Sequence, residues 1–227
     1  LLSVVLTFLL GLFLAITFNK TIRGQKIYRT LMILPYAIPG FISALIFAGM
    51  FNRSYGFINQ ELLGGANIPW LTDPWLAKLS IILVNLWLGF PYMFLIATGA
   101  LQSIPDDVEE AAAIDGASAP RQWWSIKLPL VLIATAPLLI SSFAFNFNNF
   151  NVIFLLTDGG PPVSWGTATA RGTDILISWA YNEAFRSQGG YAYGFGSAIS
   201  LIIFVITLAV SLMNFRVTGA LKDEART

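Results

Sequence analysis

The sequence predicts an all-α, polytopic membrane protein with about five membrane-spanning helices. Of its 227 residues, 56% are hydrophobic and only 11% are charged, whereas a soluble domain carries about 25% charged residues. The mean hydropathy is correspondingly high, at +0.70. Five apolar runs each approach the ~20 residues that are needed to cross a bilayer. They cover about residues 1–18, 31–51, 76–101, 128–156 and 195–215.

The runs themselves suit the membrane interior. None of them contains an acidic residue, and Lys78, close to one end, is their only basic residue. Several contain proline, which kinks a spanning helix and frees carbonyls that other helices or water must satisfy. These prolines are Pro35, Pro39, Pro91, Pro129 and Pro137.

The chain lacks residues that several classes of function usually need. The chain has no cysteine and no histidine, so disulfide frameworks, thiolate metal sites, the commonest general base and the commonest metal ligand are all missing. The net charge of +1 leaves no basic footprint for nucleic acid. The chain begins at Leu1, inside an apolar run with no charged segment before it, so we expect further sequence upstream.

The charges of the connections predict an orientation. The 19–30 link, the 102–127 loop and the tail after Phe215 hold nine of the 13 basic residues. The nine are Lys20, Arg23, Lys26, Arg29, Arg121, Lys127, Arg216, Lys222 and Arg226. The positive-inside rule places these segments in the cytoplasm, with the amino end outside and the carboxyl end inside.

The segment 103–129, SIPDDVEEAAAIDGASAPRQWWSIKLP, is too elaborate for a plain connection. Pro105 suits the first turn of a helix, and Gly116 can adopt the positive φ that ends it. Pro120 suits the first turn of a second helix, whose apolar flank includes Trp123 and Trp124. The residues leave two interpretations open. The hairpin lies on the membrane with its tryptophans as anchors, or it docks on a cytoplasmic partner.

Four asparagines interrupt the fourth apolar run, in SSFAFNFNNFNVIFLL at 141–156. A buried amide without partners costs about 1–3 kcal/mol, so each of them needs a partner. At about 100° per residue along a continuous helix, the polar side chains divide into two groups. One face holds Ser142, Phe145, Asn146 and Asn149, and the opposite side holds Asn148 and Asn151.

The same projection groups polar and small residues elsewhere. Asn85, Gly89 and Tyr92 lie within about 60° of one another in the third run, with Leu88 beside them. Tyr36 is one turn from Gly40 in the second run. Carboxamides bond to hydroxyls, and aromatic faces cover the C–H faces of a sugar. Such surfaces suit a neutral polyol, since the only charged side chain in the runs is Lys78, close to one end.

Sequence motifs also resemble a known family. EAAAIDGA at 110–117, followed by Trp124 and IKLP at 126–129, resembles the coupling-loop signature of permease subunits of binding-protein-dependent ABC importers. Three longer stretches resemble the MalF-like permeases of maltose/maltodextrin importers. They are LPYAIPGFISALIFAGMFN (34–52), NLWLGFPYMFLIATGALQSIPDD (85–107) and SFAFNFNNFNVIFLLTDGGPP (142–162). The resemblance covers nearly the whole chain.

The resemblance implies an ABC importer type I permease fold, with residues 1–227 as the C-terminal transmembrane part of a longer subunit in the bacterial inner membrane. It also implies alternating access and a set of partners: a MalG-like second permease subunit, an ABC ATPase dimer that docks on 103–127, a periplasmic sugar-binding protein and an oligosaccharide. The chain lacks GxxxxGK[ST], the motif that cradles nucleotide phosphates. We therefore expect no enzyme and no cofactor in this chain, with ATP and Mg on the ATPase partner.

The family's contact positions transfer to this chain residue by residue. The resemblance implies ATPase coupling by Glu110, Ala111, Ala112, Asp115, Gly116 and Ala117. It implies substrate binding by Tyr36, Gly40, Asn85, Leu88, Gly89, Tyr92, Ser142, Phe145, Asn146 and Asn149. Gly40 departs from the family, which has serine there, so this chain has more room and one hydrogen bond fewer at that point.

Other interpretations compete with this one. All the asparagines could hold helices together; we favour that role for Asn148 and Asn151, and sugar binding for Asn85, Asn146 and Asn149. The substrate could be another neutral sugar, such as trehalose. An ion-coupled secondary transporter needs ionisable groups inside the membrane, and a membrane enzyme needs a nucleophile–base pair. The runs supply neither.

Overall fold

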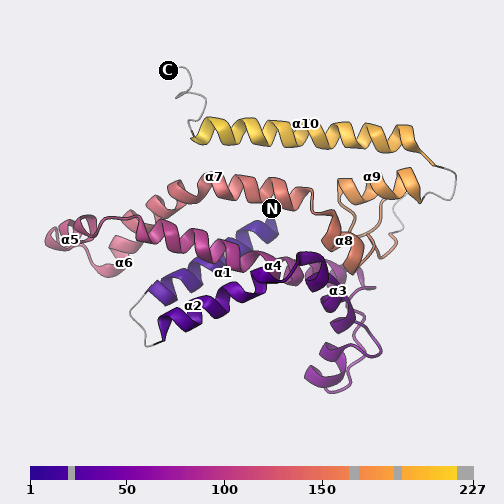
Figure 1. Ribbon diagram of the computed structural model, residues 1–227, viewed down its shortest axis with the longest axis horizontal. Helices are drawn as coiled ribbons and strands as arrows, with labels where there is room; N and C mark the ends of the chain where they lie inside the picture. Colours follow the sequence, from indigo (N-terminus) through magenta and orange to yellow (C-terminus); the bar gives the residue numbers. More distant parts are fainter. Residues whose placement is uncertain (20–23, 164–168, 187–190, 219–227) are drawn as a thin grey trace. The chain divides into compact units, whose positions relative to one another are not determined.

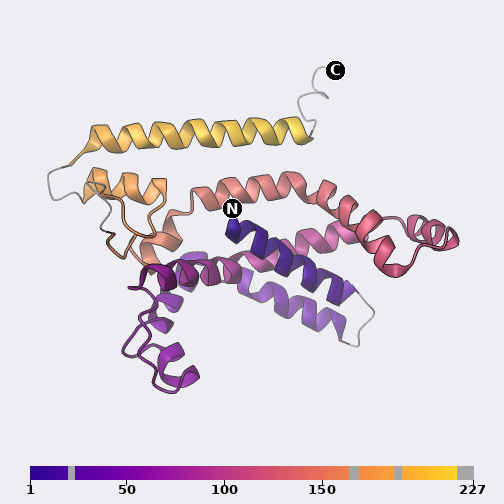
Figure 2. The same cartoon turned by 180° about the vertical axis from the view of Figure 1, so that it is seen from behind.

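The computed structural model describes residues 1–19, 24–163, 169–186 and 191–218, and all of their regular elements are helical (Figures 1 and 2). In chain order these are α1 (Leu2–Asn19), α2 (Gln25–Ile33), η1 (Leu34–Ala37), α3 (Gly40–Met50), η2 (Ile58–Leu62), α4 (Pro74–Gln102), α5 (Asp106–Ile114), α6 (Ala119–Gln122), η3 (Trp123–Lys127), α7 (Leu128–Phe147), α8 (Phe150–Leu156), α9 (Leu176–Phe185) and α10 (Tyr193–Thr218). η1 is a 3₁₀ helix, whereas η2 and η3 are π-helical.

The described helices confirm the all-α prediction and refine the number of spans. Three stretches are long and apolar enough to cross a membrane by themselves: Pro74–Gln102, Ala119–Phe147 and Tyr193–Arg216. A fourth span results if Gln25–Ala37 and Gly40–Met50 together form one broken crossing. The remaining predicted run is the shorter apolar helix Leu2–Phe18.

Two of the predicted runs are not continuous helices. The run at 31–51 breaks between η1 and α3, where Pro39 has φ −53° and ψ 130°. Proline disfavours helical backbone in the residue before it, and the extended Pro39 starts a new helix by accepting a bond from the amide of Ile42 (2.9 Å). The run at 128–156 breaks at Asn148 and Asn149.

The chain divides into two compact units, which are described separately. Unit 1 comprises Leu1–Ala37, Gly89–Phe143 and α10 from Met213; unit 2 comprises Ile38–Leu88 and Ala144–Leu212. The unit 1 core contains one buried stripe from α1 and one from the second half of α4, with Val131 of α7. The members of the two stripes are Val4, Phe8, Leu12 and Ala15, and Met93, Phe94, Ala97, Ala100 and Leu101.

A close helix approach shapes the unit 1 core. A Cβ on Gly11 of α1 would lie 2.7 Å from the backbone carbonyl carbon of Met93. No side chain fits in that space, so Gly11 allows the backbones of α1 and α4 to come together. The spacing of the buried residues on α1 matches one face of a helix.

The unit 2 core joins α3, α4 and α8. Its buried residues are Phe51, Val84, Val152 and Leu156. Trp70, in the 52–73 loop between α3 and α4, packs against them. That loop is held by Asn59, which is completely buried. The Asn59 amide donates to the carbonyls of Arg53 and Ile68 and accepts from the indole of Trp70. A polar side chain therefore organises this loop, because its hydrogen bonds compensate for its burial.

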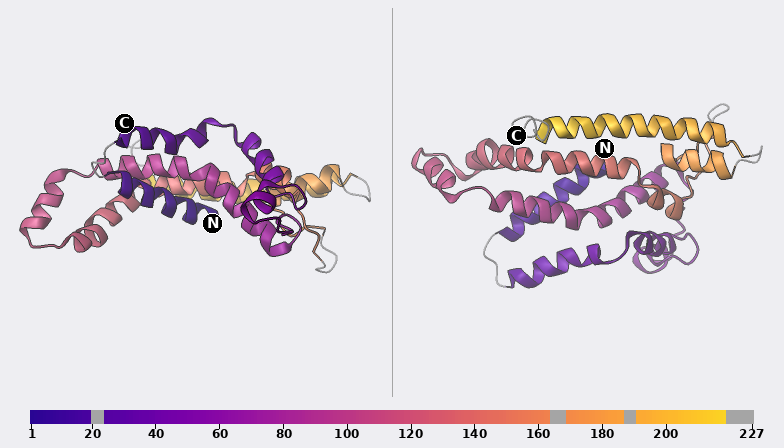
Figure 3. Two further views of the ribbon diagram at one scale, coloured as in Figure 1. Left: turned by 90° about the horizontal axis from the view of Figure 1, so that it is seen from below. Right: turned by 45° about the horizontal axis from the view of Figure 1, so that its top comes forward.

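The segment after α4 folds as the predicted helix–turn–helix, which projects from the ends of α4 and α7 in unit 1 (Figure 3). Gly116 has φ +78°. Its amide donates to the carbonyl of Ala113, and the amide of Ala117 donates to the carbonyl of Ala112. These two bonds form a Schellman motif, which confirms the predicted role of Gly116 as the end of α5.

Candidate functional site

Two predicted substrate contacts meet in unit 1. Tyr36 of η1 and Tyr92 of α4 stack with ring centroids 6.4 Å apart and planes 17° from parallel. Tyr36 is 58% exposed, so one ring face remains available. Tyr92 is partly buried against the unit 1 core. A rigid aromatic pair with one open face can cover the C–H surface of a sugar.

Gly89 has a packing role that the helical projection did not indicate. A Cβ built on it would lie 2.9 Å from Cγ2 of Thr7 in α1. Gly89 therefore accommodates α1 on α4, as Gly11 does further along the same helix pair. Ser142 of α7, also in unit 1, is buried.

Gly40, Asn85 and Leu88 belong to unit 2. A Cβ on Gly40 would meet only Cδ2 of Leu88, at an ordinary 3.8 Å. Glycine is therefore not required by packing at this position, and a serine would fit. The Asn85 amide donates to the carbonyl of Ile81, one turn earlier in α4 (3.1 Å). The Asn85 side chain is half-buried.

The asparagine run ends α7, which corrects the projection. Asn148 donates its side-chain amide to the carbonyl of Ala144 (3.2 Å), the acceptor that its backbone amide would use in a continuous α-helix. The backbone amides of Asn148 and Asn149 instead reach only three residues back, to Phe145 and Asn146. Asparagine competes for backbone partners in this way.

The helix break changes how the two predicted asparagine contacts are related. Asn146 lies in the last turn of α7, whereas Asn149 has φ −79° and ψ 77° and precedes α8. The two therefore do not share one helical face, and the 100° projection was wrong beyond Phe147. Phe145 is 72% exposed. Sugar binding by these residues stays a prediction.

Asn148 holds two helices together within unit 2. Its amide also donates to the hydroxyl of Thr207 in α10 (3.2 Å), which agrees with the predicted helix-joining role. Its buried carbonyl oxygen has no partner among the described residues. Asn151 is exposed on α8. Ser141 and Asn214 make a comparable α7–α10 bond in unit 1 (2.9 Å).

The hairpin presents most of the predicted coupling residues at its surface. Glu110, Ala111, Asp115 and Gly116 are exposed, whereas Ala117 is half-buried and Ala112 is buried. Ala112 therefore supports the turn from inside. Ile114, which is 86% exposed at the tip, was not among the predicted coupling residues. An isoleucine directly before Asp-Gly in a polar loop was the available signal.

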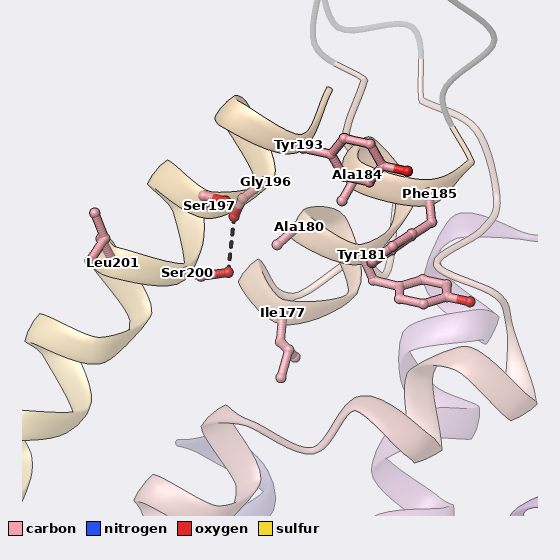
Figure 4. A pocket seen from close by; sticks show the side chains of 10 residues that line it. All are labelled: Ile177, Ala180, Tyr181, Ala184, Phe185, Tyr193, Gly196, Ser197, Ser200 and Leu201. Atoms are coloured by element: carbon pink, nitrogen blue, oxygen red, sulfur yellow. Dashed lines mark hydrogen bonds between the residues drawn. The ribbon is translucent and has the colours of Figure 1, made fainter. Parts of the chain in front are cut away.

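An open groove of about 630 Å³ lies between α9 and α10 in unit 2 (Figure 4). Gly196 packs there against Ala184, where a Cβ would approach to 2.9 Å. Ser200 donates to the carbonyl of Gly196, so its hydroxyl is used within α10 (Figure 4). The lining residues are Ile177, Ala180, Tyr181, Ala184, Phe185, Tyr193, Gly196, Ser197, Ser200 and Leu201. No predicted sugar contact is among them.

Comparison with known proteins shows that the chain is similar to curated permease proteins. The chain is 48% identical over 220 residues to the galactooligosaccharides transport system permease protein GanP of Bacillus subtilis, covering 95% of this chain and 51% of the relative. It is 48% identical over 225 residues to the maltose/maltodextrin transport system permease protein MalF of Vibrio parahaemolyticus, covering 98% and 43%. The chain thus spans about half the length of these relatives.

The fold also matches a solved structure. A chain of a bacterial ABC transporter involved in the import of the acidic polysaccharide alginate matches with a TM-score of 0.71 and 23% identity, over 96% of this chain and 75% of that chain. This likeness supports the type I permease fold. The family profile "Binding-protein-dependent transport system inner membrane component" matches residues 7–219. The chain therefore belongs to the family of binding-protein-dependent transport system inner-membrane components.

Proposed function

We propose that this chain is the C-terminal part of a permease subunit in an ATP-driven importer of neutral oligosaccharides of the maltose/maltodextrin type. The observation that carries the proposal is the 46–48% identity to MalF and GanP permeases over nearly the whole chain. In this reading the subunit works in the bacterial inner membrane beside a MalG-like permease. A periplasmic sugar-binding protein delivers the substrate.

The predicted substrate contacts favour a neutral sugar. They combine tyrosine and phenylalanine rings with asparagine amides and contain no charged side chain. Aromatic faces and amides suit the alternating apolar and hydroxyl surfaces of a sugar. An acidic polysaccharide such as alginate would require cationic partners. The fold relative therefore does not indicate this chain's substrate.

A galactooligosaccharide is the second candidate substrate. GanP and MalF of Vibrio parahaemolyticus are equally similar to this chain, at 48% identity. Gly40 also lacks the hydroxyl that we expect in the MalF-like family, and its surroundings leave room for a larger group. Both candidates are neutral, so the same aromatic and amide contacts serve either one.

The α5–α6 hairpin is the proposed docking element for an ABC ATPase dimer. Its tip exposes Ile114, Glu110 and Asp115, a small apolar and acidic surface held by the turn at Gly116. In this mechanism the ATPase binds ATP and Mg, and closure of the ATPase dimer moves the hairpin. The permease then alternates between inward- and outward-facing states, and this chain needs no cofactor of its own.

The test is uptake by the complete complex. The full-length subunit, its partner permease and the ATPase are reconstituted in proteoliposomes with the binding protein. Labelled maltose, maltotriose, trehalose, a galactooligosaccharide and an alginate oligosaccharide are then compared. We expect ATP-dependent uptake of neutral sugars, reduced by Asn146→Leu and little changed by the matched control Asn151→Leu. Uptake driven by an ion gradient without ATP would refute the proposal.

The proposed orientation has its own test. The 227 residues contain no cysteine, so Ser118→Cys in the hairpin and Ser54→Cys in the 52–73 loop introduce labelling sites on exposed residues. With any upstream cysteines replaced, a membrane-impermeant maleimide applied to spheroplasts should label position 54 and spare position 118. The reverse pattern would contradict a cytoplasmic hairpin.

A further inference from the structure

One ion pair lies at the base of the α5–α6 hairpin in unit 1, which we call the docking hairpin. The ammonium of Lys127, in η3, lies 2.5 Å from a carboxylate oxygen of Glu109, in α5. The side chains are 26% and 40% exposed, respectively. Within the described part of the chain, the neighbouring Asp107 is exposed and forms no ion pair. Glu109 thus differs from Asp107 in that it is paired with Lys127.

The ion pair connects α5 and η3, which are separated along the chain by a turn and a short helix. Between them the chain passes through the positive-φ turn at Gly116 and through α6, which has four residues. Inside this path the amide of Gln122 donates to the carbonyl of Ala117 (2.9 Å). Lys127 is the last residue before α7 begins. The ion pair therefore links the docking helix directly to the start of α7.

The start of α7 is a point where a lateral brace is useful. η3 is π-helical, and the amide of Leu128 donates to the carbonyl of Trp123, five residues back. The next residue is Pro129, which has no amide hydrogen and so cannot continue the normal ladder. π-helical turns are rare and frequently occur at functional sites. The Glu109–Lys127 pair lies directly at this turn, since Lys127 is its last residue.

From these observations we propose that Glu109 and Lys127 form a strut that makes α5 and α7 move as one body when the hairpin is displaced. The inference rests on the proposed docking of α5 on an ATPase. α7 begins directly after Lys127, and its Val131 is buried in the unit 1 core. The strut thus connects the docking surface to the segment of α7 that packs in that core, as a positioning pair without substrate contact.

The test uses charge reversal in the complete reconstituted importer. The variants are Glu109→Lys, Lys127→Glu and the double exchange Glu109→Lys/Lys127→Glu, with Asp107→Lys as the matched control on the same helix. The readouts are sugar transported per ATP hydrolysed and co-purification of the ATPase. The second readout detects loss of docking, which a strut without partner contact should leave intact.

Each single reversal should lower the transported sugar per ATP by about two- to five-fold, the range that a partly exposed ion pair can supply. The double exchange should restore the ratio, because the pair is re-formed with opposite polarity. Asp107→Lys reverses a charge of the same helix without breaking an ion pair, so it should keep the transported sugar per ATP of the unaltered chain, and any effect on docking should appear only as lower ATPase retention. A double exchange as impaired as the single variants, single variants equal to the unaltered chain, or failure of all three variants to retain the ATPase would each overturn the strut.

Failure of the strut and failure of the proposed function give different results. If the unaltered complex shows no ATP-dependent sugar uptake, the importer assignment fails before any variant is compared. If the unaltered complex transports sugar and the double exchange does not rescue, only the strut is refuted. Membrane levels of each variant are measured by immunoblot, and loss of the single variants with recovery of the double still supports a pairing of the two charges.

Discussion

Replacement of Gly116 tests whether the proposed function of the α5–α6 hairpin depends on its backbone geometry or on contacts of its surface. This glycine has φ +78°, and a Cβ built on it meets no atom within 4 Å. Within this chain, any substitution therefore acts through the backbone, because there is space for a side chain. The informative series is Gly116→Asn, Gly116→Ala and Gly116→Val.

The expected magnitudes follow from the left-handed conformation. An alanine in this region costs about 1–2 kcal/mol, asparagine tolerates it better, and β-branched valine is the least compatible. A cost of ~1.4 kcal/mol lowers the population of the native turn relative to alternatives by about ten-fold. Transport should therefore fall in the order Asn, Ala, Val, with Gly116→Val essentially inactive.

The assay is sugar uptake together with stimulation of the ATPase by the loaded binding protein, normalised to the amount of subunit in the membrane. Gly116 is exposed and belongs to neither buried core, so every variant should reach the membrane. If Gly116→Asn is more damaging than Gly116→Ala, side-chain size against the partner matters more than φ. Unchanged uptake and ATPase stimulation in Gly116→Val would refute the coupling role of the turn.

Five further variants test the packing assignments. Gly40→Ser should leave the membrane level unchanged and shift the preference among neutral sugars in the uptake panel, whereas Gly89→Ser should destabilise the subunit by about 1–3 kcal/mol in denaturant unfolding, through overpacking against α1; equal stability of the two would contradict the Cβ geometry. Asn148→Leu and Thr207→Val should destabilise by similar amounts, about 0.6–1.7 kcal/mol, and be non-additive; full additivity would show that their hydrogen bond contributes nothing. Asn59→Ala should make the 52–73 loop more sensitive to limited proteolysis, since three hydrogen bonds of a buried amide are lost; unchanged cleavage would argue against that network.

Local rules were sufficient to predict the hairpin. Helix propensity, the prolines and the need for positive φ at Gly116 all act within a few residues of the chain. The structure accordingly has α5, the Schellman turn and the second helix where they were predicted. The buried state of Ala112 and the exposure of Ile114 were not predictable in this way, because burial depends on how the two arms of the hairpin meet.

The asparagine run shows where periodicity stops being informative. A projection at 100° per residue assumes an unbroken helix, and the side chain of Asn148 breaks it by taking the carbonyl of Ala144. The composition of the run contained the warning, since asparagine competes with the backbone. Asn148 also donates to Thr207, from a distant part of the sequence, and no periodic pattern indicates that partner.

Hydropathy and the spacing of proline and glycine predicted a helical membrane protein with a hairpin after the third apolar run, and the sequence motifs indicated the permease family by resemblance. Those features are local, and they follow from bilayer thickness and backbone sterics. The role of Gly89 under α1, the stack of Tyr36 on Tyr92 and the pairing of Glu109 with Lys127 required the folded chain. Each of these contacts joins residues far apart in the sequence, and no periodic pattern specifies which distant side chains meet.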